Sequence, residues 1–159
     1  MAGREIGRVL GVDLGMKRTG LAVSDGLGIS SRGLANLTPR SRAEDVAVLV
    51  KLCTDEEVTD VAIGLPLMPR SGDVSPMSKR AAGFAQALQD ALTTSGSSTK
   101  VHLVDERGSS KQAAERLVAS EIKKGDRKAL LDSEAARILI ELFLQAGPST
   151  SMTATTTTT

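Results

Sequence analysis

The chain has 159 residues, of which 40% are hydrophobic and 25% are charged, and its formal net charge is +1. This length suits a single domain with one core, the composition excludes a disordered or fibrous protein, and the charge excludes a globally basic nucleic-acid binder. The apolar runs are too short to cross a bilayer and the first residues lack the apolar stretch of a secretory signal, so we expect a cytoplasmic protein with no membrane partner.

The chain begins with three predicted strands. Residues 7–13 and 20–25 are apolar segments joined by a polar turn, a pattern that is typical of a β-hairpin. Residues 29–37 form a weaker third strand, which Pro39 ends. All three strands therefore precede the first helix.

The first helix is predicted from Ser41 to about Glu57, because Ser41 followed by Glu44 is a capping-box signature. Cys53 lies on the apolar stripe of this helix, so we expect it in the core. Cys53 is the one cysteine of the chain and His102 is the one histidine, which excludes a zinc site built from these two residue types. We expect His102 to be structural as well.

The middle of the chain alternates between strands and a helix. Residues 60–64 and 100–104 are short apolar segments that predict strands. Between them, Ser75 and Pro76 are suited to open a helix. The apolar positions of this helix are Ala82, Ala85, Leu88 and Leu92.

Two further helices are predicted in the last third of the chain. Ser109 is suited to cap the first of them, and a loop over residues 123–128 separates it from the second. The second runs from about Asp132 to Ala146 and is apolar on most sides, so it should pack deep in the protein. Residues 148–159 are a polar Ser/Thr-rich tail without apolar periodicity, which should be disordered.

The order of these elements predicts one α/β domain over residues 1–147. An antiparallel hairpin followed by strands that alternate with helices implies a mixed sheet with helices on both faces. The sequence shows no internal repeat.

Acidic residues stand at the ends of several apolar elements: Asp13, the pair Asp105 and Glu106, and Asp132. Functional sites of α/β proteins form at the ends of strands. Carboxylates that converge from distant parts of the chain repel one another unless a cation neutralises them, and oxygen ligands suit Mg²⁺ or Mn²⁺. Taken singly, each residue also fits a simpler role, as a turn residue, a solvated loop residue or a helix N-cap.

If these carboxylates converge on divalent ions, the site would be suited to phosphodiester hydrolysis. Divalent ions activate a water and stabilise the leaving oxygen during in-line displacement at a phosphodiester. Because the chain has a single histidine, metal-based hydrolysis is favoured over an acid–base pair built on histidine.

Four segments of the chain form a recognisable set: VLGVDLGMKRTGLAVSD, DVAIGLPLMPRSGD, VHLVDERGSSKQAAERL and LLDSEAARILIELFL. In order and approximate spacing, they resemble the motif blocks of the YqgF (RuvX) family of Holliday junction resolvases and ribosomal RNA maturation enzymes. The match extends from about Arg8 to Ala146. The resemblance implies a ribonuclease H-like fold with a mixed five-stranded sheet, and a nuclease that acts on precursor 16S ribosomal RNA or on branched DNA.

The resemblance also implies roles for the acidic residues. Asp13, Glu106 and Asp132 would be the catalytic carboxylates and would bind Mg²⁺ or Mn²⁺. Adjacent residues of a strand point to opposite faces, so Asp105 and Glu106 cannot both face the metal if the strand continues that far. Of the two, we assign the ligand role to Glu106.

Glycines and basic residues near the first aspartate are candidates for binding phosphate. Gly11 and Gly15 would permit close approach of a phosphate backbone, while Lys17, Arg18 and Arg107 would hold phosphates without reading base sequence. An ordinary solvated turn is the alternative interpretation of Lys17 and Arg18.

Two other functions compete with a nuclease. A nucleic-acid-binding module of the same fold without catalysis is left open by the small net charge and by Gly108, which stands where the family usually has a bulky apolar residue. An ATPase of the actin-like type would need a second Asp-x-Gly block, and this chain has one. The sequence shows no coiled coil or obvious apolar interface, so a monomer or a weak homodimer is expected.

Overall fold

The computed structural model of the chain describes residues 7–66, 75–105, 124–146 and 152–153. Its strands are β1 (Arg8–Asp13), β2 (Thr19–Ser24), β3 (Ser31–Leu37), β4 (Val58–Leu65), β5 (Lys100–Asp105) and β6 (Met152–Thr153). Its helices are α1 (Arg42–Asp55), α2 (Pro76–Thr94) and α4 (Lys124–Ala146). The predicted helix after Ser109 lies outside the described residues.

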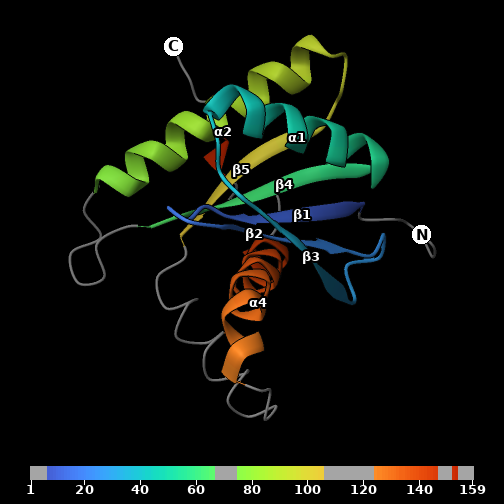
Figure 1. The fold of residues 1–159 in the computed structure, drawn as a ribbon. Helices are drawn as coiled ribbons and strands as arrows, with labels where there is room; N and C mark the ends of the chain where they lie inside the picture. Colours follow the sequence, from blue (N-terminus) through green and yellow to red (C-terminus); the bar gives the residue numbers. More distant parts are fainter. Residues whose placement is uncertain (1–6, 67–74, 106–123, 147–151, 154–159) are drawn as a thin grey trace.

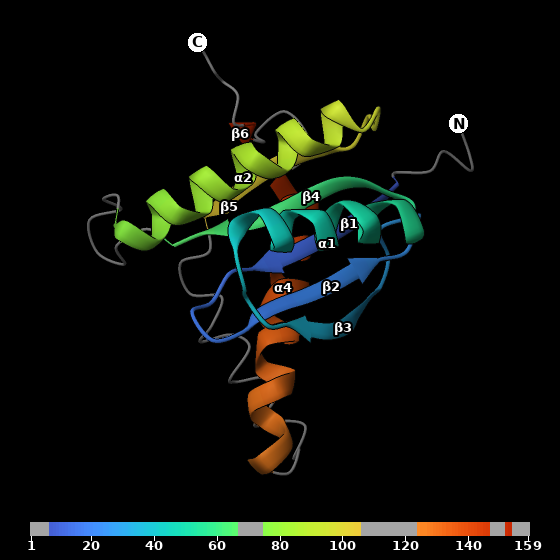
Figure 2. The same cartoon turned by 45° about the horizontal axis from the view of Figure 1, so that its top comes forward.

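A mixed sheet forms the middle layer of the structure. Its strand order is β3-β2-β1-β4-β5-β6. Helices α1 and α2 lie side by side over one face, and α4 packs against the other (Figures 1 and 2). This arrangement confirms the prediction of an α/β fold with a mixed sheet and helices on both faces.

The strand directions place several chain ends at one edge of the sheet. β1 pairs antiparallel with β2, and β2 pairs antiparallel with β3, which confirms the predicted hairpin. β4 and β5 both run parallel to β1. The carboxyl ends of β1, β3, β4 and β5 therefore lie at the same edge, which we call the carboxyl edge.

The capping residues of α1 and α2 are those that the sequence indicates. The Ser41 side chain accepts a hydrogen bond from the backbone N–H of Glu44 at 3.1 Å. Ser75 and Ser78 form a reciprocal capping box at the start of α2, and Pro76 occupies the first turn. Each cap satisfies backbone donors that the first helical turn leaves unpaired.

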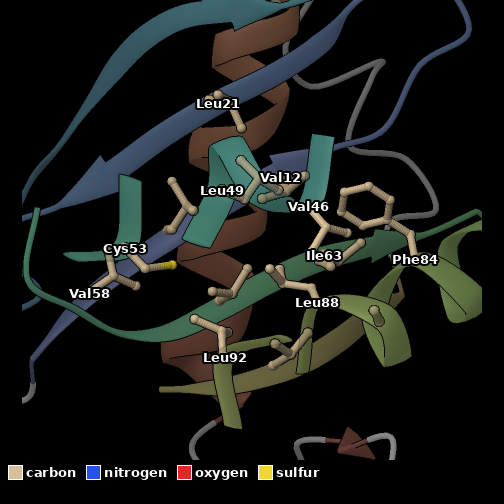
Figure 3. Close-up of a cluster of buried hydrophobic side chains, with 14 of the residues drawn as sticks. Val12, Leu21, Val46, Leu49, Cys53, Val58, Ile63, Phe84, Leu88 and Leu92 are labelled. Atoms are coloured by element: carbon tan, nitrogen blue, oxygen red, sulfur yellow. The ribbon is translucent and has the colours of Figure 1, made fainter. Parts of the chain in front are cut away.

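The larger core lies between the sheet and the pair α1 and α2 (Figure 3). Its buried members include Leu10, Val12, Leu21, Leu49, Ile63, Phe84 and Leu88. Cys53 belongs to this core, as predicted, and its burial raises the pKa of the thiol to about 12. One predicted position is wrong, because Ala82 is exposed while Ala81 and Phe84 face the core.

Helix α4 begins earlier than the sequence predicts. It starts at Lys124, so most of the loop expected over residues 123–128 is helical, and Asp132 lies inside the helix rather than at its N-cap. Gly125 lies within this segment, but one glycine costs a helix only about 1 kcal/mol relative to alanine. The neighbouring Lys, Arg, Ala and Leu residues are good helix formers that offset this cost.

Helix α4 packs closely on the sheet because small residues line its path. Gly33, Ala22, Gly11 and Ala62 are aligned across four neighbouring strands. A Cβ atom at Gly33 would lie 2.8 Å from the Ser133 side-chain oxygen, and one at Gly11 would overlap the backbone carbonyl of Ala136. The smaller core forms here, and its members are Val9, Ala22, Ala62, Ala136, Ile140 and Phe143.

The sixth strand departs from the expectation of a five-stranded sheet and an unstructured tail. Met152 and Thr153 pair antiparallel with Leu103 and His102 of β5. Backbone pairing to a sheet edge needs no apolar periodicity, which is why the sequence pattern gave no signal for β6. No helix within the described part of the chain is long and apolar enough to span a bilayer.

Candidate active site

Asp13 is the last residue of β1 and lies at the carboxyl edge, partly buried. Side chains alternate between the two faces along a strand. Val9 contributes to the core under α4 and Gly11 contacts α4, so Asp13 lies on the same face. β1 therefore presents this carboxylate on the α4 side of the sheet.

Glycines flank Asp13 on both neighbouring strands. Asp13 is paired with Gly20 of β2, and Gly64 of β4 follows the residue that pairs with Val12. Neither glycine has a side chain to occupy the sheet surface beside the carboxylate. β2 and β4 thus place no side chain of their own beside Asp13 on the α4 side, and both glycines are buried.

The alternation along β5 distinguishes Asp105 from Glu106. Val101 is buried in the core under α1 and α2, whereas the His102 ring contacts Phe143 of α4 with centroids 4.7 Å apart. Odd-numbered residues of β5 therefore face α1 and α2, which places the exposed Asp105 on the side opposite Asp13. Glu106 lies outside the described residues, and so does Arg107.

The third predicted carboxylate, Asp132, lies on the helix that packs against the Asp13 face of the sheet. Its side chain is outside the described part of the structure, while its neighbour Ser133 is close to Gly33 of β3. Among the side chains that the structure describes, no group of three or more His, Cys, Asp or Glu residues is arranged to hold a metal ion. The joining of Asp13, Glu106 and Asp132 in one site thus remains a prediction.

The conformation of the turn after Asp13 requires a glycine at position 15. A Cβ atom there would overlap the carbonyl oxygen of Arg18, so only glycine fits this closed turn. Lys17 is exposed and Arg18 is half-buried. Gly11 has a different role from the one predicted, because it makes room for α4 and not for a phosphate.

Arg80 is part of this region, and the sequence analysis missed it. Its Nη1 donates a hydrogen bond to the carbonyl oxygen of Gly15 at 3.3 Å, from a position 65 residues further along the chain. No local motif signals a contact over that separation. α2 is itself tied to the carboxyl edge, since the Ser75 hydroxyl donates to the carbonyl of Pro66 at 3.1 Å.

His102 has the structural role that the sequence predicts. Its Nε2 lies 2.9 Å from Oδ1 of Asp60, and the ring is buried between the sheet and α4. Thr59 also donates to Asp60, at 2.9 Å. These residues lie in the amino-terminal halves of their strands, away from the carboxyl edge and from Asp13.

Comparison with known proteins gives a consistent result. A family profile described as RuvX, Holliday junction resolvase, matches residues 7–146. A protein of Anaeromyxobacter dehalogenans (strain 2CP-C) named "Putative pre-16S rRNA nuclease" is 39% identical over 86% of this chain and 96% of its own length. A protein of the same name from Myxococcus xanthus is 34% identical over 87% and 88% of the two chains.

Solved structures extend the comparison to the fold. RuvC of Thermus thermophilus in complex with a Holliday junction substrate matches with a TM-score of 0.56 and 16% identity, over 89% of this chain and 96% of that one. A second structure of RuvC from Thermus thermophilus matches with a TM-score of 0.52 and 17% identity, over 91% and 98%. These likenesses confirm the predicted ribonuclease H-like fold.

Proposed function

Because the chain belongs to the RuvX family of Holliday junction resolvases, we propose that it is a nuclease that hydrolyses phosphodiester bonds with Asp13, Glu106 and Asp132 as its catalytic carboxylates. The observation that carries this proposal is the position of Asp13. It ends the central strand β1 on the α4 side of the sheet, with glycines on both neighbouring strands.

A divalent metal, Mg²⁺ or Mn²⁺, fits these residues. Three carboxylates offer the oxygen donors that such ions prefer, and Gly20 and Gly64 place no side chain of their own beside Asp13. A bound divalent ion supplies the Lewis acidity that phosphodiester hydrolysis needs. These carboxylates would hold the ion.

The pairing of the strands supports Glu106 rather than Asp105 as the second carboxylate. If the alternation of β5 continues by one residue, Glu106 follows His102 and Val104 onto the α4 side, which is also the side of Asp13. The position of Asp132 on α4 supports the third carboxylate, because α4 covers this same face.

Phosphates of the substrate would be held by the turn after β1. Gly15 keeps that turn closed, and Lys17 and Arg18 bring positive charge within it, with Arg107 as a further cation after β5. Such contacts position the backbone without reading bases. The substrate is therefore a nucleic acid recognised by its backbone and shape, either precursor 16S ribosomal RNA or branched DNA, and we propose a cytoplasmic site of action.

The test compares purified wild-type chain with the Asp13→Asn variant in Mg²⁺ or Mn²⁺. A labelled four-way DNA junction and a labelled precursor 16S ribosomal RNA are offered side by side. Loss of a metal ligand should lower the cleavage rate by roughly 1000-fold or more, since several kcal/mol of transition-state stabilisation disappear. The Asp90→Asn variant is the matched control, because Asp90 is an exposed carboxylate on α2 whose one side-chain hydrogen bond among the described residues comes from Gln86.

Each result has a distinct meaning. Cleavage that the Asp13→Asn change abolishes and the Asp90→Asn change spares supports the proposal and identifies the substrate. Wild-type rates in the Asp13→Asn variant would remove Asp13 from the site. Binding of either nucleic acid without any cleavage by the wild-type chain would favour the non-catalytic binding module instead.

A further inference from the structure

The arginines that the structure describes differ in whether a carboxylate neutralises them. Arg8 and Arg32 both contact Glu56, at 3.3 Å and 2.7 Å, and Arg137 contacts Glu134 at 3.1 Å. Arg42 and Arg80 have no carboxylate partner within the described residues. Their positive charge is therefore available to a ligand.

Both of these arginines lie near the carboxyl edge. Arg42 is the first residue of α1, which follows β3, and Arg80 lies in the second turn of α2, which follows β4. Because β1, β3 and β4 all end at this edge, the two helices begin beside the end of β1. Figure 2 shows the first turns of α1 and α2 on the side to which the arrowhead of β1 points.

A glycine on α2 brings the two arginines together. A Cβ atom at Gly83 would lie 2.7 Å from Nη2 of Arg42, so the guanidinium of Arg42 occupies the space above Gly83. Gly83 is three residues after Arg80, and residues at that spacing share one face of a helix. The guanidinium of Arg42 therefore lies over a position of α2 that is about one helical turn from the backbone of Arg80.

Arg80 joins this pair to the candidate active site. Its Nη1 bonds to the carbonyl of Gly15 in the turn after Asp13. A guanidinium has five N–H donors, and this bond is the one contact recorded for the Arg80 side chain among the described residues. The half-buried side chain is thus oriented by the turn while most of its donors remain available.

Charges of both signs lie around this arginine pair. Arg40 and Lys79 also lie near the starts of α1 and α2, and neither side chain has a carboxylate partner among the described residues. The nearest carboxylates along α1 serve its first turn: Asp45 accepts from the backbone N–H of Arg40 at 3.1 Å, and Glu44 accepts from the Ser41 hydroxyl at 2.9 Å. The exposed Asp105, at the end of β5 on the α1 and α2 side, adds a negative charge to this edge, so the local positive charge is that of the residues at the starts of α1 and α2.

We propose that Arg42 and Arg80 form a phosphate-binding site for the nucleic-acid backbone on the α1 and α2 side of the carboxyl edge. This inference rests on the proposed nuclease function. Guanidinium groups bind phosphate oxygens in a bidentate manner and do not read bases, so the site accepts RNA and DNA alike. The backbone passes from the carboxylates on the α4 side, over the turn that contains Gly15, to this arginine pair.

The experiment measures binding without cleavage. Fluorescence anisotropy in EDTA follows a labelled four-way DNA junction and a labelled precursor ribosomal RNA fragment over a range of salt concentrations. The variants are Arg42→Gln, Arg80→Gln and the double variant. Arg32→Gln is the matched control, since it removes the same charge from an arginine that Glu56 already neutralises. Thermal unfolding of each variant is recorded alongside.

Each lost phosphate contact should make the plot of log affinity against log salt shallower by about 0.9 on duplex DNA. The double variant should therefore lose about 1.8 of the wild-type slope and bind several-fold more weakly for each arginine, while Arg32→Gln retains both values. Arg80→Lys keeps the charge and should restore the slope without restoring the full affinity. If Arg80→Gln fails to fold, Arg42→Gln alone must show the smaller slope change.

A wild-type slope in the folded double variant overturns the inference and leaves the proposed nuclease function intact. An equal loss in Arg32→Gln also overturns it, because the effect would then come from net charge and not from this site. If the wild-type chain binds neither nucleic acid, the proposed function itself fails, and this inference fails with it.

Discussion

Gly11 sits in the middle of β1, where a glycine weakens a strand. The structure gives the reason for it. α4 crosses β1 at this point, and an added Cβ atom would overlap the carbonyl of Ala136 and lie 3.0 Å from Cγ1 of Ile140. Both neighbours are held by a buried helix, so neither can move aside easily.

We therefore expect Gly11→Ala to reduce the free energy of unfolding by about 1–3 kcal/mol, as overpacking of a core does. Gly83→Ala is the matched control, because its Cβ meets only the flexible end of Arg42. Alanine is also the better helix former, so Gly83→Ala should be neutral or stabilising by up to about 1 kcal/mol. Urea unfolding of both variants tests this pair, and equal stability of Gly11→Ala and wild type would contradict the close packing of α4.

The structural role of some residues could be predicted from the sequence, and that of others could not. The core position of Cys53 followed from its place on an apolar stripe, and the structural role of His102 followed from its place in a strand. The packing of Gly11 against α4 was not predictable, because it depends on how near a distant helix comes. The contact of Arg80 with Gly15 could not be predicted either, since it joins two segments that are far apart in the chain.

The turn between β2 and β3 is stabilised by the carboxylate of Asp25. Asp25 accepts hydrogen bonds from the backbone N–H groups of Leu27 and Ile29 at 3.0 Å and of Ser30 at 3.2 Å. These bonds, led by that from Ile29, lower the pKa of Asp25. The ionised carboxylate is thus favoured in the folded turn.

A pKa lowered by folding has a definite consequence for stability. The contribution of Asp25 is present above the pKa of an unfolded aspartate, 3.8, and is lost as the pH falls through the lower folded value. We expect Asp25→Asn to lower the unfolding temperature by a few degrees at pH 7 and to lose less stability than wild type on acidification below pH 3.8. Thermal unfolding between pH 2 and 7 measures this, with Asp90→Asn as control. Parallel curves for wild type and Asp25→Asn would be the contrary result.

Element boundaries were predictable where a cap stands in the sequence. Ser41 and Ser75 mark the starts of α1 and α2 because their hydroxyls bond to backbone groups within the same turn. The start of α4 was misjudged, since no such signal precedes Lys124 and tertiary packing outweighs the cost of Gly125. β6 was missed for a related reason: its pairing with β5 depends on a free sheet edge, which a local pattern does not report.

At the scale of the whole molecule, the two faces of the sheet carry cores of different size. The core under α1 and α2 contains the larger set of apolar residues and orders the carboxyl edge. The core under α4 is smaller and ends next to Asp13. If Asp13, Glu106 and Asp132 gather on this second face as proposed, their mutual repulsion would lower the stability of the metal-free chain, and a bound cation would reverse the effect.

Metal binding should therefore raise the free energy of unfolding, and this increase can be measured independently of catalysis. At a Mn²⁺ concentration of roughly 100 times the dissociation constant, linkage adds about 2.7 kcal/mol to the folded state. For a chain of this size that corresponds to an increase of about 5–10 °C in unfolding temperature. Asp13→Asn removes one of the proposed ligands, so its increase should be much smaller, whereas Asp90→Asn should respond like wild type. EDTA should return the wild-type chain to its metal-free value. If Asp13→Asn gained as much as wild type, the ion would bind at a site that does not include Asp13.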